Sequence, residues 1–453
     1  MRRQVAFLVA RLADWFIHAF SLGSGSTWPG HIALKIDPHI VAGMLRQSDC
    51  QVVLVAGTNG KSTTASMIRT MLRVNGVRLM YNEEGANLLN GIASTIIRAA
   101  SWRGEIGARV AVFEVDENAL TALAAETKPS VIVLLNLFRD QLDRYGEVNT
   151  IVASWKKMLA DHPAATVIVN ANDPLINSLA HKRSHTIRFG AAHSLMRRRH
   201  LGHDVDSTFC PLCRHALTFD AIAYSHVGQY HCPKCGFATG SVLTYEKERF
   251  AAYPLLGLYN VYNTHAALAT AAHLTSLSPK VLHADLMQHF TPMFGRQEVV
   301  RYRGRRIMLI LSKNPAGFNQ SLATLTEAAR EGGVGVLMLL NDQIPDGRDV
   351  SWIWDTDMSG IGDIDTVVVG GDRAYDMALR VSYEQAAPQK PKRKSKGYVL
   401  GKGMFASKDL ESALDYLVDH SPEHAQLFIL PTYSAMLAVR RFVVGSKFDP
   451  QSS

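Results

Sequence analysis

A glycine-rich segment that ends in Lys-Ser-Thr is the part of this sequence best suited to bind phosphate groups. It reads Gly57-Thr58-Asn59-Gly60-Lys61-Ser62-Thr63. Glycines let backbone N–H groups close around phosphate oxygens, a lysine reaches the outer phosphates, and a hydroxyl after the lysine can ligate Mg²⁺. The segment therefore predicts a nucleotide site, with Lys61 on the phosphates and Ser62 on the metal ion.

The residues on either side place this segment between a strand and a helix. Residues 51–56 are a short apolar run typical of a buried strand, and residues 62–74 read as a helix. Anions bind at such junctions because the N-terminus of a helix carries partial positive charge. The general phosphate-loop motif begins with a glycine where this chain has Val55, so its general form is incomplete.

Carboxylates follow a second predicted strand, over residues 109–113. The strand leads into Glu114-Val115-Asp116-Glu117. Mg²⁺ prefers a few such oxygens together with substrate phosphates, and open parallel sheets bind ligands at the carboxyl ends of their strands. Glu114, directly at the strand end, is the predicted Mg²⁺ ligand beside Ser62. Asp116 and Glu117 would also suit the start of a helix.

Two Cys-x-x-Cys pairs have the spacing of a four-thiolate metal site. The ligands are Cys210, Cys213, Cys232 and Cys235. Two short turns can bring four such thiolates onto one tetrahedral ion, and thiolate-only ligation favours Zn²⁺ over the alternatives of an iron–sulfur or redox site. Because four thiolates leave no open position for water, the zinc is expected to fold an insert at about 200–245 without doing chemistry.

The fifth cysteine, Cys50, comes just before the first predicted strand and is interpreted as a small buried residue, not a nucleophile. The chain then shows no cysteine placed like that of a glutaminase. If it makes an amide with nitrogen from glutamine, the ammonia must come from another subunit.

Composition and charge exclude several other classes of protein. The chain has 453 residues, of which 47% are hydrophobic, enough for two or three cores. The net charge of +8 depends largely on one run, Lys390-Pro391-Lys392-Arg393-Lys394-Ser395-Lys396. Such a run is more often a solvated loop than a nucleic-acid or lipid patch, so no nucleic-acid partner is expected.

The N-terminal residues 5–20 are apolar but interrupted by Arg11, Asp14 and His18 at helical spacing. They predict an amphipathic helix that packs on the protein, with contact to a membrane surface as the alternative. No later segment approaches the roughly 18 uninterrupted apolar residues of a membrane-spanning helix. Without a cleavable-looking signal, and with cysteines in metal spacing, a reducing cytoplasm is the expected compartment.

A second α/β unit is predicted after residue 307. Strand-like residues 307–311 lead into a turn with Lys313 and Asn314, then a helix and a strand at 335–340. Further on, residues 341–355 combine carboxylates with two tryptophans. On composition alone this segment reads equally as a functional loop or as a capped turn with aromatic packing.

Together with residues 256–263 and 294–298, these motifs resemble the Mur ligases of peptidoglycan synthesis, from about Val52 to Glu298. Within that group the chain is most similar to the MurT family, through residues 81–87, the Asp140-Gln141-Leu142-Asp143 motif, the cysteine-rich insert and the 341–355 loop. The resemblance implies a central P-loop ATPase domain with an inserted four-cysteine zinc ribbon and a C-terminal doubly wound α/β domain.

The implied boundaries are an N-terminal helix and lead-in at 1–45, an ATPase domain at 46–300 and a MurT-type domain at 301–453. By the same resemblance Asn260 and Asn263 contact the base of ATP, and Arg296 reaches the phosphates. Mur ligases carry an aspartate and a histidine where this chain has Lys313 and Asn314, so the nucleotide contact from that turn is left open.

The resemblance also implies a reaction and a partner. ATP would phosphorylate the α-carboxylate of D-glutamate in the stem peptide of lipid II, and ammonia would then displace phosphate to give D-isoglutamine. A GatD-like glutaminase would supply the ammonia as the other half of a heterodimer. Asp349, chosen over Asp355, would complete the Cys-His machinery of that partner. An amino-acid-adding Mur ligase or a folylpolyglutamate-synthase-like ligase acting alone is the alternative.

Overall fold

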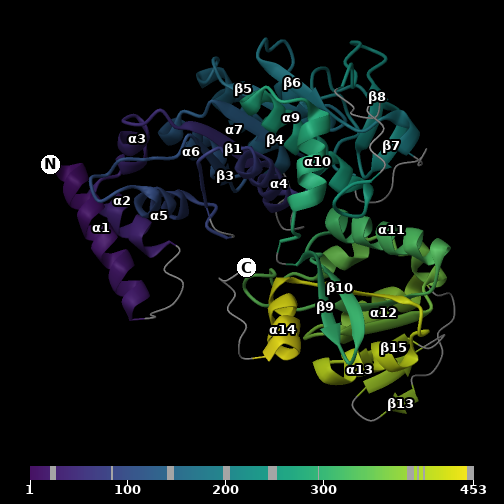
Figure 1. Cartoon of the computed structure of the whole chain (residues 1–453). Helices are drawn as coiled ribbons and strands as arrows, with labels where there is room; N and C mark the ends of the chain where they lie inside the picture. The colour runs from purple at the N-terminus through teal and green to yellow at the C-terminus, as the bar shows by residue number, and fades with distance from the viewer. Residues whose placement is uncertain are drawn as a thin grey trace.

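The computed structural model describes residues 1–20, 27–82, 85–139, 147–196, 205–242, 252–293, 295–384, 392–394, 397–400 and 404–445. Figure 1 shows two lobes, each built around a sheet, with the N-terminal helices at the outer edge of the first lobe. The predicted Asp140–Asp143 motif, Glu83, Glu84 and Phe294 lie outside the described residues.

The first lobe contains a six-stranded parallel sheet in the order β2-β3-β1-β4-β5-β6. Its strands are β1 (Gln51–Ala56), β2 (Leu79–Tyr81), β3 (Val110–Glu114), β4 (Val131–Leu134), β5 (Thr166–Asn170) and β6 (Thr186–Phe189). Alternate residues of β1 face two different cores, with Leu54 in one and Val55 in the other. Burial on both faces explains why the strand reads as a continuous apolar run.

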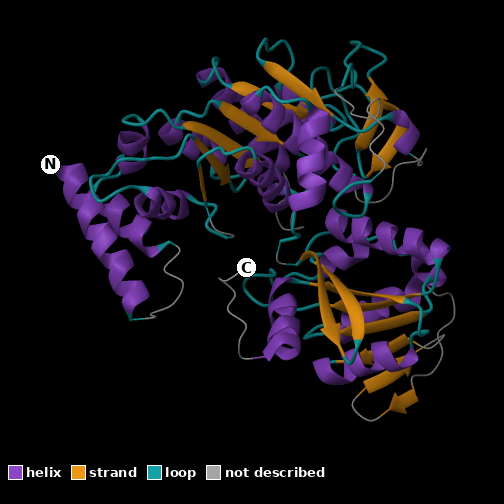
Figure 2. Cartoon of the chain, viewed as in Figure 1, coloured by secondary structure: helices purple, strands orange, loops and turns teal. Residues whose placement is uncertain are grey.

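Helices cover both faces of this sheet (Figure 2). They are α4 (Lys61–Val74), α5 (Leu89–Ala99), α6 (Leu120–Thr127), α7 (Glu147–Asp161), α8 (Pro174–Leu179), α9 (Leu258–Thr275) and α10 (Pro279–His289). Asp173 caps α8 by accepting hydrogen bonds from the N–H groups of Leu175 and Ile176.

The cysteine-rich insert forms a small unit with a two-stranded antiparallel hairpin, β7 (Thr218–Tyr224) and β8 (Val227–His231). Cys210, Cys232, Tyr230 and Phe237 form its small core. A core this small needs a further constraint to be stable.

The second lobe contains an eight-stranded sheet in the order β13-β14-β15-β12-β11-β16-β10-β9. The strands are β9 (Arg296–Tyr302), β10 (Arg305–Ile310), β11 (Val334–Leu339), β12 (Thr366–Gly370), β13 (Lys392–Lys394), β14 (Gly397–Leu400), β15 (Met404–Ser407) and β16 (Gln426–Pro431). The five strands from β15 to β10 are parallel, as in a doubly wound domain. Because β9 pairs with β10, this sheet begins at Arg296, before the predicted boundary at 301.

Helices α11 (Pro315–Glu331), α12 (Ala374–Glu384), α13 (Leu410–His420) and α14 (Tyr433–Val444) pack on the second sheet. Two short 3₁₀ helices follow β11, η3 (Ser351–Asp355) and η4 (Ser359–Asp363). The predicted solvated loop in the basic run is partly wrong, because Lys392–Lys394 forms the edge strand β13.

The N-terminal segment folds into α1 (Arg2–Ala19), α2 (Trp28–Ile36) and α3 (Ile40–Leu45). The predicted amphipathic helix is confirmed as a helix packed on the protein, but Arg11 and Asp14 of its polar stripe point inward. Arg11 donates to the carbonyl oxygens of Ile97 and Arg98 at 2.8 and 2.7 Å, and Asp14 pairs with Arg98 at 2.7 Å. No helix among the described residues is both long and apolar enough to cross a membrane.

A buried histidine gives the fold of the first lobe a predicted acid sensitivity. On α9, the Nδ1 of His265 lies 2.8 Å from the carbonyl oxygen of Gly190, and its Nε2 lies 3.1 Å from the hydroxyl of Tyr253. Burial lowers the pKa of His265 to about 4. In the unfolded chain a histidine has a pKa of about 6.5, so the unfolded state takes up a proton that the folded state excludes.

We therefore expect the free energy of unfolding to fall by about 3 kcal/mol between about pH 6.5 and about pH 4 from this group alone. In His265→Gln this contribution should be absent, and urea unfolding across that range should show a shallower pH dependence. His31→Gln, at an exposed position, is the control. Equal slopes for the parental chain and His265→Gln would contradict the assignment.

Candidate nucleotide-binding and ligase site

The glycine-rich loop lies at the carboxyl end of β1, between β3 on one side and β4 on the other. This is the switch point of the sheet, where ligands of open parallel sheets bind. The helix α4 begins at Lys61, so the N–H groups of its first turn have no partner within the helix and can face an anion. Ser62 and Thr63 in that turn are buried.

Close packing requires glycine at two positions of the loop. Gly57 and Gly60 have φ angles of +143° and +89°. A methyl group at Gly60 would lie 2.2 Å from Oδ1 of Asn263, and one at Gly57 would lie 2.9 Å from Cβ of Leu135. Val55, by contrast, is an ordinary residue of β1 that pairs with Glu114 and Val133, so glycine is not needed there.

Hydrogen bonds to the end of β4 fix the loop. The backbone N–H of Phe138 donates to Oγ1 of Thr58 at 3.0 Å, and the Thr58 hydroxyl donates to the Phe138 carbonyl at 3.2 Å. Asn59 and Asn136 exchange two bonds of 2.9 Å, each between the backbone of Asn59 and the side chain of Asn136. Thr58 therefore holds the shape of the loop, because its hydroxyl is hydrogen-bonded to Phe138 in the segment after β4.

The Lys61 side chain turns back over its own loop. Its Nζ donates to the carbonyl oxygens of Gly57 at 2.7 Å and Thr58 at 3.2 Å, and it pairs with Glu117 at 3.3 Å. Glu117, which the sequence offered only as a possible helix start, is thus the carboxylate beside the lysine, and the prediction that Glu114 binds Mg²⁺ stays a prediction. Glu114 is the last residue of β3, and its backbone N–H donates to Oδ1 of Asn82.

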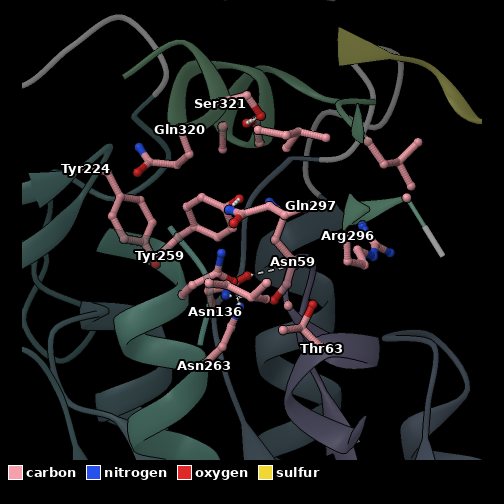
Figure 3. Close-up of a pocket in the computed structure, with 18 of the residues that line it drawn as sticks. Asn59, Thr63, Asn136, Tyr224, Tyr259, Asn263, Arg296, Gln297, Gln320 and Ser321 are labelled. Carbon is pink, nitrogen blue, oxygen red and sulfur yellow. Dashed lines mark hydrogen bonds between the residues drawn. The ribbon is translucent and has the colours of Figure 1, made fainter. Parts of the chain in front are cut away.

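A pocket opens beside the loop and between the two lobes (Figure 3). Its lining brings together six of the predicted residues: Asn59, Gly60, Thr63, Asn260, Asn263 and Arg296. Residues that sequence reasoning did not single out as ligands also line it: Asn136, Phe138, Tyr224, Tyr259, Gln297, Gln320 and Ser321. Asn136 follows shortly after a strand, which is a position where ligand-binding residues are expected in the sequence. The residues next to Tyr224 in the sequence give no such indication.

The two predicted asparagines of α9 brace the loop from below the pocket. Asn263 Nδ2 donates to Oδ1 of Asn260 at 3.0 Å, and Asn260 Nδ2 donates to the carbonyl of Leu256 at 2.7 Å. Both side chains are buried. Asn263 also makes the close approach to Gly60, so this pair sets the position of the loop, besides lining the pocket.

The second lobe closes the pocket through the start of α11. Asn314 caps this helix by accepting from the N–H of Gly317 at 2.8 Å, and its Nδ2 donates to Oδ1 of Asn59 at 3.2 Å. Gln320 and Ser321 lie one turn further along the helix, on the pocket lining. The turn that sequence reasoning left open thus contacts the phosphate loop directly, through an amide.

Known protein families match most of the chain. The Mur ligase middle domain matches residues 55–271, and the MurT ligase C-terminal domain matches residues 311–436. The MurT subunit of lipid II isoglutaminyl synthase from Staphylococcus aureus (strain COL) is 32% identical over 398 residues, or 84% of this chain and 88% of that protein. The chain belongs to the MurT family. The MurT subunit from Streptococcus pneumoniae is 31% identical over 93% of both chains.

Solved structures support the Mur ligase fold of this MurT-family chain. A pseudomurein peptide ligase type C from Methanothermus fervidus has a TM-score of 0.61 at 20% identity and covers 87% of this chain and 78% of its own. MurF ligase from Thermotoga maritima, solved with ADP, has a TM-score of 0.60 at 14% identity over 91% of this chain and 83% of its own. The predicted fold is confirmed, and this fold implies ATP and Mg²⁺.

The four cysteines of the insert converge as predicted. Their sulfur atoms all lie within 4.8 Å of one another, with 3.6 Å between Cys210 and Cys235 and 3.4 Å between Cys213 and Cys232. Four thiolates about 2.3 Å from one tetrahedral ion would be about 3.8 Å apart. The donor set and its spacing therefore fit Zn²⁺, which would cross-link the insert.

Two matching turns shape this metal site. The N–H of Arg214 donates to the carbonyl of Cys210 at 2.9 Å, and the N–H of Gly236 donates to that of Cys232 at 3.0 Å. Arg214 and Gly236 both adopt positive φ angles, +64° and +75°. The glycine suits this conformation, whereas the arginine occupies it against its preference.

The insert also forms one wall of the nucleotide pocket. Tyr224, the last residue of β7, lines the pocket, and the ring of Phe138 lies 6.1 Å from its ring and 4.9 Å from that of His226. Asp206, just before the first cysteine pair, accepts a hydrogen bond from the N–H of Arg139 at 2.9 Å and pairs with its side chain. The zinc unit is therefore attached to the same β4 segment that fixes the phosphate loop.

Asp349 lies in a second depression on the C-terminal lobe, together with Arg348, Ser351, Trp354, Arg373 and Asp376. It is exposed, and its Oδ1 accepts a hydrogen bond from the N–H of Ser351 at 2.8 Å. The side-chain and backbone hydrogen bonds from Ser351 hold the pKa of Asp349 below its ordinary value. The interpretation of this segment as a capped turn with aromatic packing is confirmed, because Asp349 caps the turn and the nearby Trp352 is buried against Phe318.

The close approach at Gly60 predicts a selective loss of nucleotide binding in Gly60→Ala. The added methyl group would collide with Asn263 and displace the loop or α9, so we expect nucleotide affinity to fall about tenfold or more. Gly76→Ala is a matched control, since Gly76 also has a positive φ, +73°, but open space around it. That variant should lose about 1 kcal/mol of stability and keep its affinity. If calorimetric titration with ADP gave the same affinity for Gly60→Ala as for the parental chain, the proposed role of this contact would be contradicted.

The position of Tyr224 predicts that zinc and nucleotide binding are coupled. Removing the metal, or replacing Cys210 by Ser, should loosen the hairpin and thereby lower ADP affinity. Tyr224→Ala should lower ADP affinity directly, because it removes a side chain that lines the pocket. Leu212→Ala, at a half-exposed position of the first knuckle, should leave affinity unchanged. Chelation that releases zinc without altering ADP affinity would show that the insert does not support the pocket.

Proposed function

We propose that this chain is the ATP-using subunit that amidates the α-carboxylate of D-glutamate in lipid II, giving D-isoglutamine with ammonia from a partner glutaminase. The observation that carries the proposal is one pocket that joins a Mur ligase phosphate loop to a MurT-type C-terminal domain. The relatives from Staphylococcus aureus and Streptococcus pneumoniae are named as subunits of that synthase.

In the first half of the reaction, a carboxylate oxygen of D-glutamate attacks the γ-phosphorus of ATP, ADP leaves, and an acyl phosphate forms. Lys61 and Arg296 would neutralise the charge of the phosphoryl group, since such transfer depends mainly on positioning and electrostatics. Ser62 and Glu114 would hold Mg²⁺, which would supply further positive charge against the phosphates. Glu117 is the neighbour that orients Lys61.

In the second half, ammonia attacks the acyl carbon, the carbon–oxygen bond to phosphate breaks, and the nitrogen loses a proton to give the neutral amide. The cysteines of the chain argue for an external ammonia source. Burial raises the pKa of Cys50 to about 11, which keeps its thiol protonated at neutral pH. The other four form the metal cluster. A glutaminase nucleophile must then belong to a GatD-like partner in a heterodimer.

Asp349 is suited to act on such a partner. Its carboxylate is accessible and ionised, and two exposed apolar side chains, Trp354 at 47% and Leu379 at 51%, line the same depression. A carboxylate supplied from a neighbouring subunit can orient a catalytic histidine and stabilise its cationic form. Asp355, two residues after the buried Ile353, is half-buried and less available.

Reconstitution tests the reaction. We expect the chain with a candidate glutaminase, glutamine, ATP and lipid II to yield amidated lipid II by mass spectrometry. Lys61→Ala should lower the rate by about a hundredfold or more, and Lys156→Ala, at an exposed position of α7, should not. Incorporation of a free amino acid without the partner would instead support an amino-acid-adding or folylpolyglutamate-type ligase.

The role of Asp349 has a sharper test, because added ammonium salt bypasses the glutaminase. With glutamine as donor, Asp349→Asn should lower amidation by about a hundredfold or more. With ammonium as donor the same variant should retain the parental rate, and Asp355→Asn should behave as parental with both donors. If Asp349→Asn lost amidation with both donors, Asp349 would belong to the ligase site. If only Asp355→Asn lost glutamine-dependent amidation, Asp355 would be the residue that acts on the partner.

The proposed substrate also has a consequence for location. Lipid II is anchored in the membrane and its peptide is modified on the cytoplasmic side, so the enzyme would work as a peripheral protein at the inner face of the membrane.

A further inference from the structure

The helix α1 presents a continuous apolar face away from the protein. We call the following side chains the α1 outer face: Val5, Leu8, Val9, Leu12, Trp15, Phe16 and Phe20. They recur at helical spacing and are 40–61% exposed. Figure 1 shows α1 along the outer edge of the first lobe, with α2 and α5 on its inner side. This exposure contrasts with an ordinary surface helix, which buries its apolar stripe.

The attachment of α1 explains why this face is left outside. Ala6, Phe7 and Ala10 are buried in the core of the first lobe. Arg3 donates to the carbonyl of Gly43 at 2.8 Å, and Arg11 donates to the ends of α5. The polar side chains of the helix are thus used to hold it on the protein. The side chains of the outer face remain largely in contact with water, which is unfavourable for apolar groups.

Tryptophans in or beside the helices that pack on α1 are exposed as well. Trp102, after α5, is 60% exposed, and the guanidinium of Arg11 lies 5.3 Å from the centre of its ring. Trp28, which begins α2, is 63% exposed. Tryptophan prefers the boundary between lipid headgroups and acyl chains, where its ring is apolar and its N–H meets water.

The charges beside the α1 outer face are mainly positive. Arg2 begins the helix, Arg103 follows Trp102, and Lys35 is exposed on α2. Of the nearby carboxylates, Asp14 is paired with Arg98, Asp37 at the end of α2 accepts a hydrogen bond from the N–H of His39, and Glu105 is exposed on the loop of Arg103. A helix with an apolar face and flanking cations fits an anionic lipid surface. Two copies of this surface would repel one another through the same cations.

We infer that the α1 outer face, with Trp28 and Trp102, docks on the surface of an anionic lipid bilayer and lies in its plane. The helix does not cross the bilayer, in keeping with its length and charges. The docking itself is independent of the chemistry of the nucleotide pocket. Its use, which is to bring that pocket to a lipid-linked peptide, rests on the proposed function.

Flotation of the full chain with vesicles tests the inference. We expect it to float with vesicles of phosphatidylcholine and phosphatidylglycerol, less with phosphatidylcholine alone, and less at high salt. The double variant Leu12→Glu, Trp15→Glu should partition at least about tenfold more weakly. Val281→Glu replaces an apolar side chain of α10 that is 47% exposed and should float as the parental chain does. Equal flotation of parental chain and double variant would overturn the inference.

Two further measurements separate a lipid surface from other occupants. A concentration-dependent dimer in sedimentation velocity that the double variant loses, without flotation, would assign the face to a second copy. Loss of the glutaminase from the purified complex would assign it to that subunit. Unchanged ADP binding and thermal unfolding would show that the variant is folded.

Comparison of two substrates separates this inference from the proposed reaction. If both are right, the double variant should amidate a lipid-free muropeptide at the parental rate and lipid II in vesicles more slowly. Flotation of the parental chain without amidation of either substrate would refute the reaction and leave the docking surface intact. Equal rates of both proteins on vesicle-bound lipid II would overturn the proposed use of docking.

Discussion

The approach of Asn263 to Gly60 is the contact on which the nucleotide site depends. With only 2.2 Å between the amide oxygen and the position a methyl group would take, the loop and α9 can adopt this arrangement only with glycine. The contact fixes α9 against the loop, and α9 leads through α10 to β9 and the second lobe. One steric constraint thus links the phosphate loop to the chain segment that returns Arg296 to the pocket.

Amide side chains continue this linkage across the lobes. Asn136 holds the backbone of Asn59 from the end of β4, while Asn314 reaches the Asn59 side chain from α11. Amides suit this position because each offers both a donor and an acceptor without bringing a further charge next to phosphate. The loop is therefore held from two domains, and any movement between the lobes would change the position of the loop where the nucleotide phosphates bind.

Two peripheral features of the first lobe are attached by different means. The cysteine-rich insert has a small core that a metal ion on its four cysteines would cross-link, and it contacts Arg139 after β4 through Asp206 and lines the pocket through Tyr224. The N-terminal helix α1 instead is held by Arg3, Arg11 and Asp14 and leaves apolar side chains exposed. The insert therefore forms part of the pocket wall, whereas α1 packs on α2, α3 and α5.

The phosphate loop, the strand and helix around it, the four-cysteine cluster and the family could be predicted from the sequence, because these depend on local spacing or on residue types with few uses. The resemblance to the family also brought Asn260, Asn263 and Arg296 to the nucleotide site. Three features became visible only in the folded chain: Glu117 pairs with Lys61, Tyr224 of the insert lines the pocket, and Arg11 and Asp14 of α1 face inward. Each of these depends on contacts between segments far apart in the chain, and such contacts leave no periodicity or spacing in the sequence from which they could be predicted.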